Sequence, residues 1–155
     1  MTTKKRWVRQ LPKNTVEADN LDKIIEASHG NKRKFLVVVI GSTKRAADLI
    51  KNKLGLDIKN YDHTIDNYAI QHSYAKHKND PIPLKKSDFR KIRSVIKTAD
   101  RIYWDSNRSK NAIVYEKNYL RKYRLVYVEK IYKNRRELAM KTMYWQPRAK
   151  SRHKK

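Results

Sequence analysis

The chain contains no cysteine, which excludes disulfide scaffolds, cysteine-ligated zinc sites and thiol catalysis. It has 3 glycines, too few for a glycine-rich phosphate-binding loop. The longest apolar run, at residues 35–40, is far shorter than the roughly 20 residues that cross a membrane. The N-terminus is basic with no apolar stretch behind it, so we expect no secretory signal and a soluble, cytoplasmic protein.

Acidic residues are scarce as well. Among the 155 residues, 15 Asp and Glu stand against 39 Lys and Arg, which gives a formal net charge of +24. Positive charges at this density repel one another and favour a polyanionic partner. Nucleic acid is the first candidate and an anionic membrane the second. A membrane partner is disfavoured, because we expect no helix with a basic face and a bulky apolar face of the required length.

The length suits one domain with basic ends. We assign residues 1–33 to a basic N-terminal extension, 34–146 to the folded domain and 147–155 to a basic C-terminal tail. Cationic segments of this kind add affinity for phosphates that does not depend on nucleotide sequence.

The first half of the domain predicts one strand and then helices. The run at 35–40 is short and β-branched, as in a buried strand. Ser42 or Thr43 is expected to cap the following helix and Gly55 to end it. A second helix is expected from about Thr64 to His77, after a connector.

The second half changes to a strand pattern. Four β-branched and aromatic segments, at 101–105, 111–117, 123–132 and 137–145, are separated by short polar turns. Strands joined so tightly form an antiparallel meander. The sequence therefore predicts an α+β fold in which N-terminal helices pack on one face of a four-stranded antiparallel meander sheet, and the other face is free to carry a site.

Three of the five histidines, His63, His72 and His77, lie within residues 62–80. His72 and His77 are five residues apart, or about 140° around a helix, whereas helical metal pairs are four apart. We therefore expect no metal site and no cofactor. On spacing alone, the simpler interpretation is a partly buried His72 and a His77 stabilised by the helix dipole.

Histidines on a cationic chain also suit the chemistry of RNA. The 2′-hydroxyl of RNA is its own nucleophile, so cleavage needs a base, an acid and donors for the phosphorane charge, but no metal. Histidine titrates near neutral pH and can serve as acid or base. The same residues could instead only bind phosphate.

Four segments in order carry a family resemblance: GLDIKNYDHTIDNYAIQHSYAKH (55–77), DPIPLKKSDFRKIRSVIKTADRI (80–102), AIVYEK (112–117) and TMYW (142–145). Over roughly residues 35–146 the chain resembles the phage-associated nuclease branch (PBECR) of the barnase–EndoU–colicin–RelE superfamily. This resemblance implies helices on a four-stranded antiparallel sheet, with an active site on the open face. It also implies a metal-independent endoribonuclease that forms a 2′,3′-cyclic phosphate, in a phage or mobile-element effector or toxin.

The resemblance also suggests roles for individual residues. His72 matches one of the paired helix histidines and is expected to be a general base or acid. His77 is expected to be the second proton-transfer group, or else to orient the helix end. Thr142 and Tyr144 are expected to donate hydrogen bonds to the scissile phosphate, and Lys117 to clamp it. The expected phosphate and RNA contacts are Lys117, Lys76, Lys110 and Lys130.

The last strand leaves two arrangements open. Tyr144 alternates with Thr142, Met140 and Leu138, so a strict period of two would bury it with apolar neighbours. Either the strand bulges before Thr142, or these residues share a half-exposed face.

Two further alternatives concern function. Glu129 could be a carboxylate base on the sheet, although we rank it below His72. The chain could also be a non-catalytic nucleic-acid-binding protein, because a fold does not guarantee its chemistry. The expected partners are RNA, with tRNA or mRNA among the candidates, and an acidic antitoxin or immunity protein.

Overall fold

The computed structural model describes residues 16–17, 21–29, 36–41, 43–119 and 121–148. Most of the predicted basic extensions, 1–33 and 147–155, lies outside these ranges. The described elements are β1 (Val16–Glu17), α1 (Leu21–His29), β2 (Leu36–Gly41), α2 (Lys44–Leu54), β3 (Asp62–Asp66), α3 (Asn67–Lys76), α4 (Lys86–Phe89), α5 (Ile92–Thr98), β4 (Arg101–Trp104), β5 (Ala112–Asn118), β6 (Tyr123–Tyr132), a 3-10 turn (Lys133–Arg135) and β7 (Glu137–Pro147).

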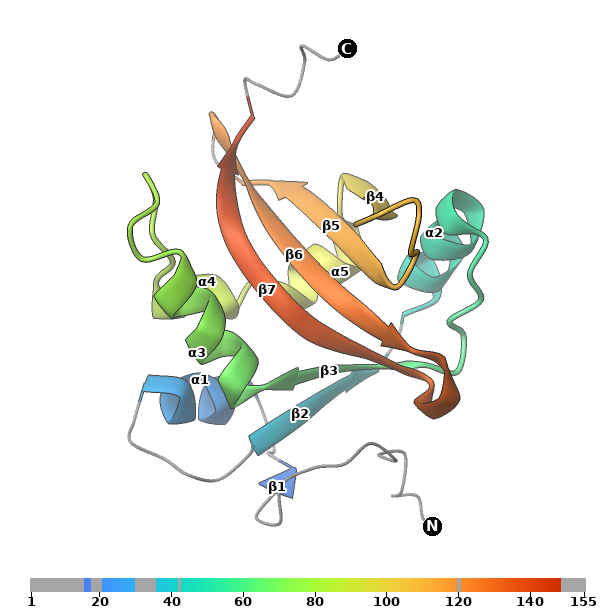
Figure 1. The fold of residues 1–155 in the computed structure, drawn as a ribbon, viewed down its shortest axis with the longest axis horizontal. Coiled ribbons are helices and arrows are strands. Elements are labelled where there is room, and N and C mark those ends of the chain that lie inside the picture. The colour runs from blue at the N-terminus through green and yellow to red at the C-terminus, as the bar shows by residue number, and fades with distance from the viewer. Residues whose placement is uncertain (1–15, 18–20, 30–35, 42, 120, 149–155) are drawn as a thin grey trace.

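The described strands form one seven-stranded mixed sheet in the order β1-β2-β3-β7-β6-β5-β4 (Figure 1). Strands β4 to β7 are the predicted antiparallel meander. On the other side of β7, β3 pairs in parallel, β2 pairs antiparallel to β3, and β1 pairs in parallel with β2. The α+β class is therefore confirmed, while the four-stranded sheet is corrected to a larger, mixed one.

The extra strand β3 falls where we expected a connector and the start of a helix. The β-branched Thr64 and Ile65 pair with β2 instead. The helix α3 begins only at Asn67, because the Asp66 carboxylate caps it by accepting the Ala69 N–H at 2.7 Å. The predicted helix from Thr64 is thus wrong in its first turn.

Helix α2 agrees with its predicted ends. The Thr43 hydroxyl accepts the Ala46 N–H at 3.2 Å, which caps the first turn. Gly55 ends the helix at a φ of 74°, and its N–H donates to the Lys51 carbonyl. Ser42, the alternative cap, lies outside the described residues.

The main core lies between one face of the sheet and the helices. It joins buried residues of α1 to α5 to those that point inward from the sheet. Ile24 and Ile25 of α1 are among them, although this helix lies in the range assigned to the N-terminal extension. Figure 1 shows α5 behind the sheet, α3 beside β7, and no described helix in front of β5, β6 and β7. None of the described helices is both long and apolar enough to span a membrane.

A polar network is buried inside this core. Glu129 is fully buried, and its carboxylate lies 2.7 Å from His63 Nδ1 and accepts the Tyr115 hydroxyl at 2.6 Å. His63, expected in a connector, is instead a fully buried residue of β3. Buried polar groups are retained when hydrogen-bonded, so this network ties β3, β5 and β6 together.

These buried phenols predict an alkaline limit of stability. Burial raises the pKa of Tyr115 and Tyr127 well above its usual value, and the Glu129 carboxylate raises it further. Above about pH 10 the unfolded chain loses phenol protons that the folded chain retains, so the free energy of unfolding falls as pH rises. Urea unfolding at a series of pH values measures this slope.

The variant Tyr115→Phe separates this effect from general alkaline damage. It removes one of the phenols, so the slope above about pH 10 is expected to become shallower. At neutral pH it costs about 1–3 kcal/mol, because Glu129 loses a donor. The half-buried Tyr123, changed to Phe, is the control; an equal slope in wild type and Tyr115→Phe contradicts the prediction.

Candidate active site on the open face of the sheet

A β-bulge in β7 determines which side chains face the open side. Val128 of β6 pairs with Thr142, but the next residue, Glu129, pairs with Met140. Lys141 is therefore the extra residue of a bulge, which reverses the alternation along the strand. Of the two open arrangements, the structure has the bulge before Thr142.

The bulge separates the apolar residues of β7 from the candidate site residues. Met140 before it and Met143 after it both belong to the main core. Thr142 and Tyr144 point to the opposite face, where Tyr144 packs against the small apolar residues Val126 and Val128, among others. The two residues expected to contact the scissile phosphate thus share the open face.

Helix α3 runs along the edge of β7 and is fastened to it by Ser73. The Ser73 hydroxyl donates to the Ala69 carbonyl at 2.9 Å and accepts the Met143 N–H at 3.2 Å. Its oxygen also lies 3.3 Å from the Thr142 hydroxyl. We call this line of contact between α3 and β7 the seam. Ser73 was missed by the sequence analysis, although its spacing of four residues from His77 places the two on one helix face.

His77 lies at one end of the seam. Its Nδ1 is 2.7 Å from the Asp80 carboxylate, and its ring stacks on Tyr144 with centroids 4.8 Å apart. When Asp80 accepts the Nδ1 proton, Nε2 is the atom left to take or give a proton. Nε2 is buried and has no hydrogen-bond partner in the part of the chain that the structure describes. The side chain is 14% exposed, so the position of the His77 ring is fixed by its contacts, unlike that of a mobile surface histidine.

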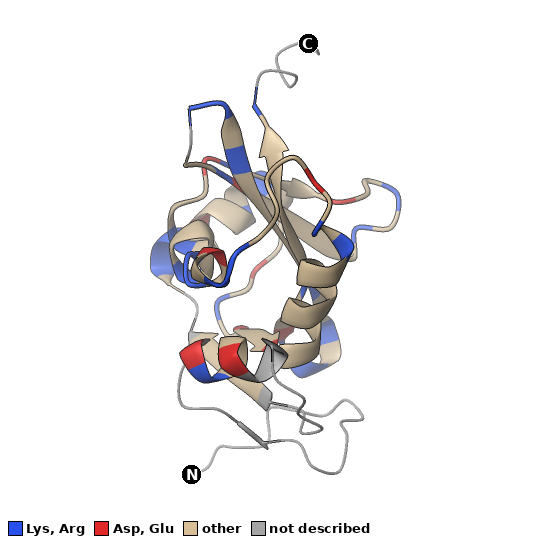
Figure 2. Cartoon of the chain, turned by 90° about the vertical axis from the view of Figure 1, so that its left-hand side faces the viewer, with Lys and Arg blue, Asp and Glu red and all other residues tan. Residues whose placement is uncertain are grey.

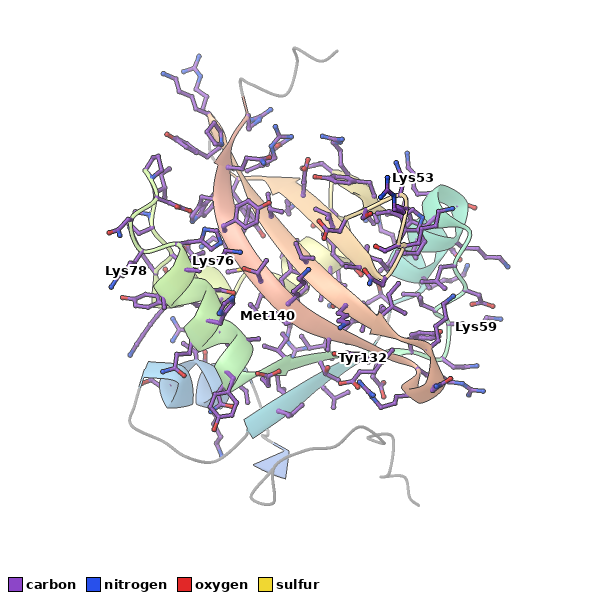
Figure 3. The ribbon with its side chains drawn as sticks, in the orientation of Figure 1. Lys53, Lys59, Lys76, Lys78, Tyr132 and Met140 are labelled. Carbon is purple, nitrogen blue, oxygen red and sulfur yellow. The ribbon has the colours of Figure 1, made fainter. Side chains whose placement is uncertain are left out.

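His72 lies further along the seam, in a pocket of about 280 Å³. Its side chain is exposed, and the pocket brings it near the Lys130 and Lys141 side chains. The pocket is lined by Asp66, Ala69, His72, Lys130, Tyr132, Ala139, Met140 and Lys141. Figure 3 shows Met140 and Tyr132 in this part of the sheet. Two of the predicted residues, His72 and Lys130, thus meet in one pocket.

The other predicted lysines lie elsewhere. Lys117 points toward the helices, because its ammonium donates to the Thr98 carbonyl at 3.3 Å and lies over the Tyr119 ring. It is on the opposite face of the sheet from Thr142, so the expected phosphate clamp is not part of this site. Lys110 is exposed in the turn between β4 and β5. Lys76 is exposed near the C-terminal end of α3, one turn after His72 (Figure 3).

Glu116, the neighbour of Lys117, is the residue that the sequence analysis missed on the open face. It is 3% exposed, and its Oε1 accepts hydrogen bonds from Arg124 at 2.9 Å and from Arg101 at 3.1 Å. Its Oε2 accepts the Tyr103 hydroxyl. Strand alternation places Glu116 and Lys117 on opposite faces, but the positions before them are apolar on both faces, so the sequence does not show which of the two points outward. Glu129, the alternative base, faces the core instead and cannot serve this face.

The phenols of this face are held in their protonated form. Burial raises the pKa of Tyr144, and the Glu116 and Asp105 carboxylates raise it further. Burial and then the hydrogen bond to Glu116 raise the pKa of Tyr103. At neutral pH both phenols are protonated. The Tyr103 hydroxyl donates its proton to Glu116, so Tyr144 is the phenol of this pair that can donate to a phosphate.

The described carboxylates are largely taken by partners within the chain. Surface examples pair Asp22 with Arg90, Glu26 with Lys86, Asp48 with Lys44 and Asp105 with Lys141. Because Lys and Arg outnumber these carboxylates, many of the Lys and Arg side chains face solvent. Figure 2, which views the α3 side, shows Lys and Arg on most elements in view, with Asp and Glu evident on α1. Lys53 and Lys59 lie on the other side of the molecule, near α2 (Figure 3).

Residues 42–153 match the family described as phage-Barnase-EndoU-ColicinE5/D-RelE like nuclease, PBECR3. The chain belongs to this nuclease family. Comparison with curated proteins and with solved structures gave no match. The matched range contains α2 to β7 and therefore the whole seam, so the resemblance inferred from the sequence is confirmed.

Within the described ranges, no group of three or more His, Asp or Glu side chains could hold a metal ion. His77 is already bonded to Asp80 through its Nδ1.

The variant Ser73→Ala tests whether the seam supports the site. It leaves the buried Met143 N–H without its acceptor, so we expect a loss of about 1–3 kcal/mol in the free energy of unfolding. Because α3 then loses its tie to β7, nuclease activity is expected to fall more than the fraction of unfolded protein explains. Urea unfolding and RNA cleavage on the same preparation measure both. Ser87→Ala, at an exposed serine of α4, is the control, and equal behaviour of the two variants contradicts the prediction.

Proposed function

We propose that this nuclease cleaves RNA without a metal ion, by attack of the 2′-hydroxyl on the adjacent phosphate. Membership of the nuclease family supports phosphodiester cleavage in general. The observation that carries the finer proposal is the seam, where His72 lies in a lysine-lined pocket and His77 is bonded to a carboxylate. Five residues rise about 7.5 Å along a helix axis, so the two histidines lie at successive positions along the seam.

The proposed reaction assigns the two histidines different roles. His72 takes the proton of the 2′-hydroxyl while the 2′ oxygen forms its bond to phosphorus. The bond from phosphorus to the 5′ oxygen breaks, and His77 gives that oxygen a proton. The products are a 2′,3′-cyclic phosphate and a 5′-hydroxyl. His77 is assigned as the acid because the Asp80 carboxylate holds its Nδ1, which leaves Nε2 as the atom that can give a proton to the leaving oxygen.

The phosphorane carries extra negative charge, which nearby donors stabilise. In the proposal Lys130 and Lys141 supply charge from the pocket, and Thr142 and Tyr144 supply hydroxyl donors. In the same proposal Lys76, which is exposed one turn after His72, contacts the RNA backbone next to the scissile phosphate.

A second candidate is a nucleic-acid-binding protein that does not cleave. It is favoured by the formal net charge of +24. Both candidates bind RNA with a steep dependence on salt, so affinity does not distinguish them.

A phage or mobile-element effector is the biological role we propose for the nuclease, since the family is phage-associated. A cell that makes an active ribonuclease needs it silenced, and an acidic inhibitor would complement this charge.

Cleavage in the presence of a chelator is the decisive test of the enzyme. Purified protein in excess EDTA is expected to cut RNA and to leave 2′,3′-cyclic phosphate ends, identified by mass spectrometry. His72→Ala and His77→Gln should each lower the cleavage rate about 10²–10⁴-fold, the contribution of a positioned acid or base. Gln71→Ala, at an exposed neighbour on α3, should leave the rate unchanged.

The substrate itself supplies the second control. Replacing every 2′-hydroxyl by hydrogen should abolish cleavage while leaving binding. Cleavage of the 2′-deoxy strand, or a requirement for added metal, rules out the proposed mechanism. RNA binding without any cleavage in wild type and His72→Ala alike supports the binding protein instead.

A further inference from the structure

Two rows of side chains cross the open face from β7 to β4. The first row runs from Thr142 through Val128 and Val114 to Tyr103. The second row runs from Tyr144 through Val126 and Glu116 to Arg101. Strands are about 4.8 Å apart, so each row spans about 14 Å.

The middle of this face is apolar and its ends are not. Ala112, Val114, Val126 and Val128 form a second small core, against which Tyr103 and Tyr144 pack from either side. Both tyrosine rings are only partly buried. The Tyr144 ring is already stacked on His77. At the other end of the face, the partly buried Tyr103 ring lies beside the guanidinium of Arg101.

That guanidinium, on Arg101, is held in place. Its Nη1 donates to Glu116 at 3.1 Å, and its Cζ lies 4.9 Å from the centre of the Tyr103 ring. Glu116 is in turn fixed by the buried Arg124. The Arg101 side chain is still 57% exposed, so its other donors can meet a ligand. A pre-oriented, exposed guanidinium is the geometry that binds phosphate in two-point fashion.

We propose that Arg101 binds a phosphate of single-stranded RNA one or more nucleotides away from the scissile one, with an intervening base stacked on Tyr103. The proposal rests on the proposed function, and it adds the substrate class and a subsite on β4. Every base has a face that can stack on a tyrosine, but only an unpaired strand can present it. The bases of a duplex stay stacked on each other, so a duplex cannot stack a base on a tyrosine ring.

Binding of an RNA that cannot be cut tests this without relying on cleavage. A fluorescently labelled 2′-O-methyl single strand and its duplex are titrated with protein, and anisotropy is measured over a series of salt concentrations. We expect the single strand to bind more tightly than the duplex. Arg101→Ala should weaken single-strand binding about 10-fold and lower the slope of log affinity against log salt by about 0.7, the value for one lost phosphate contact.

Arg93→Ala is the matched control, because this exposed arginine lies on α5, behind the sheet. It removes the same charge and should change affinity less than about two-fold with the salt slope unchanged. Equal losses for Arg101→Ala and Arg93→Ala overturn the proposal, and so does equal binding of strand and duplex.

Tyr103 provides a second pair of variants. Tyr103→Phe keeps the aromatic plane and should retain most of the single-strand affinity, whereas Tyr103→Leu removes it and should lose about 10-fold. Equal affinities of the two variants overturn the stacking role.

On cleavable RNA, Arg101→Ala should raise KM and leave kcat unchanged. A loss confined to kcat overturns the assignment of Arg101 to binding. Failure of wild-type protein to cleave leaves these binding results intact, so the two proposals fail separately.

Discussion

One extra residue in β7 decides what the open face of the sheet contains. Without the bulge at Lys141, the strand would place Thr142 and Tyr144 on the same side as Leu138 and Met140, inside the core. A shift of one residue exchanges the two faces of a strand. With the bulge, apolar side chains fill the core on both sides of it, and the hydroxyl residues are released to the other face. Lys141 itself projects at the bend and lines the pocket beside His72.

The mixed sheet explains why a helix can lie beside this bulge. β3 pairs with β7 over only three residues, from Glu137 to Ala139, and the chain then turns into α3. Beyond that point the edge of β7 has N–H groups that need acceptors. Ser73 satisfies one of them, at Met143. The short parallel pairing therefore delivers the helix to the strand edge, and both histidines come with it.

The meander, the caps of α2 and the bulge alternatives could be predicted, because each depends on local patterns of two or 3.6 residues. The strand predicted at 35–40 is β2, but β1 and β3 were not predicted. Their pairing could not be predicted either, since β3 and β7 join residues more than seventy positions apart. The buried contact of His63 with Glu129 also joins distant residues and could not be predicted.

Lys117 shows a different limit of prediction from sequence. The resemblance located its strand, but a neighbouring position in the strand, Glu116, faces the site, and only the register with β4 and β6 distinguishes the two.

The few carboxylates near the open face have a common arrangement, in which each lies against at least one cationic or ionisable side chain. Asp80 holds His77, Glu116 holds Arg101, and Asp105 lies 3.7 Å from Lys141. A protein that attracted polyanions only by its net charge would gain nothing from these pairs, because each acid cancels a positive charge. Their effect is to fix donors in position before a ligand arrives, which strengthens their interaction with a charge that develops during reaction. The placement of acids in this very basic chain therefore favours a site built for directed contacts over a diffuse cationic surface.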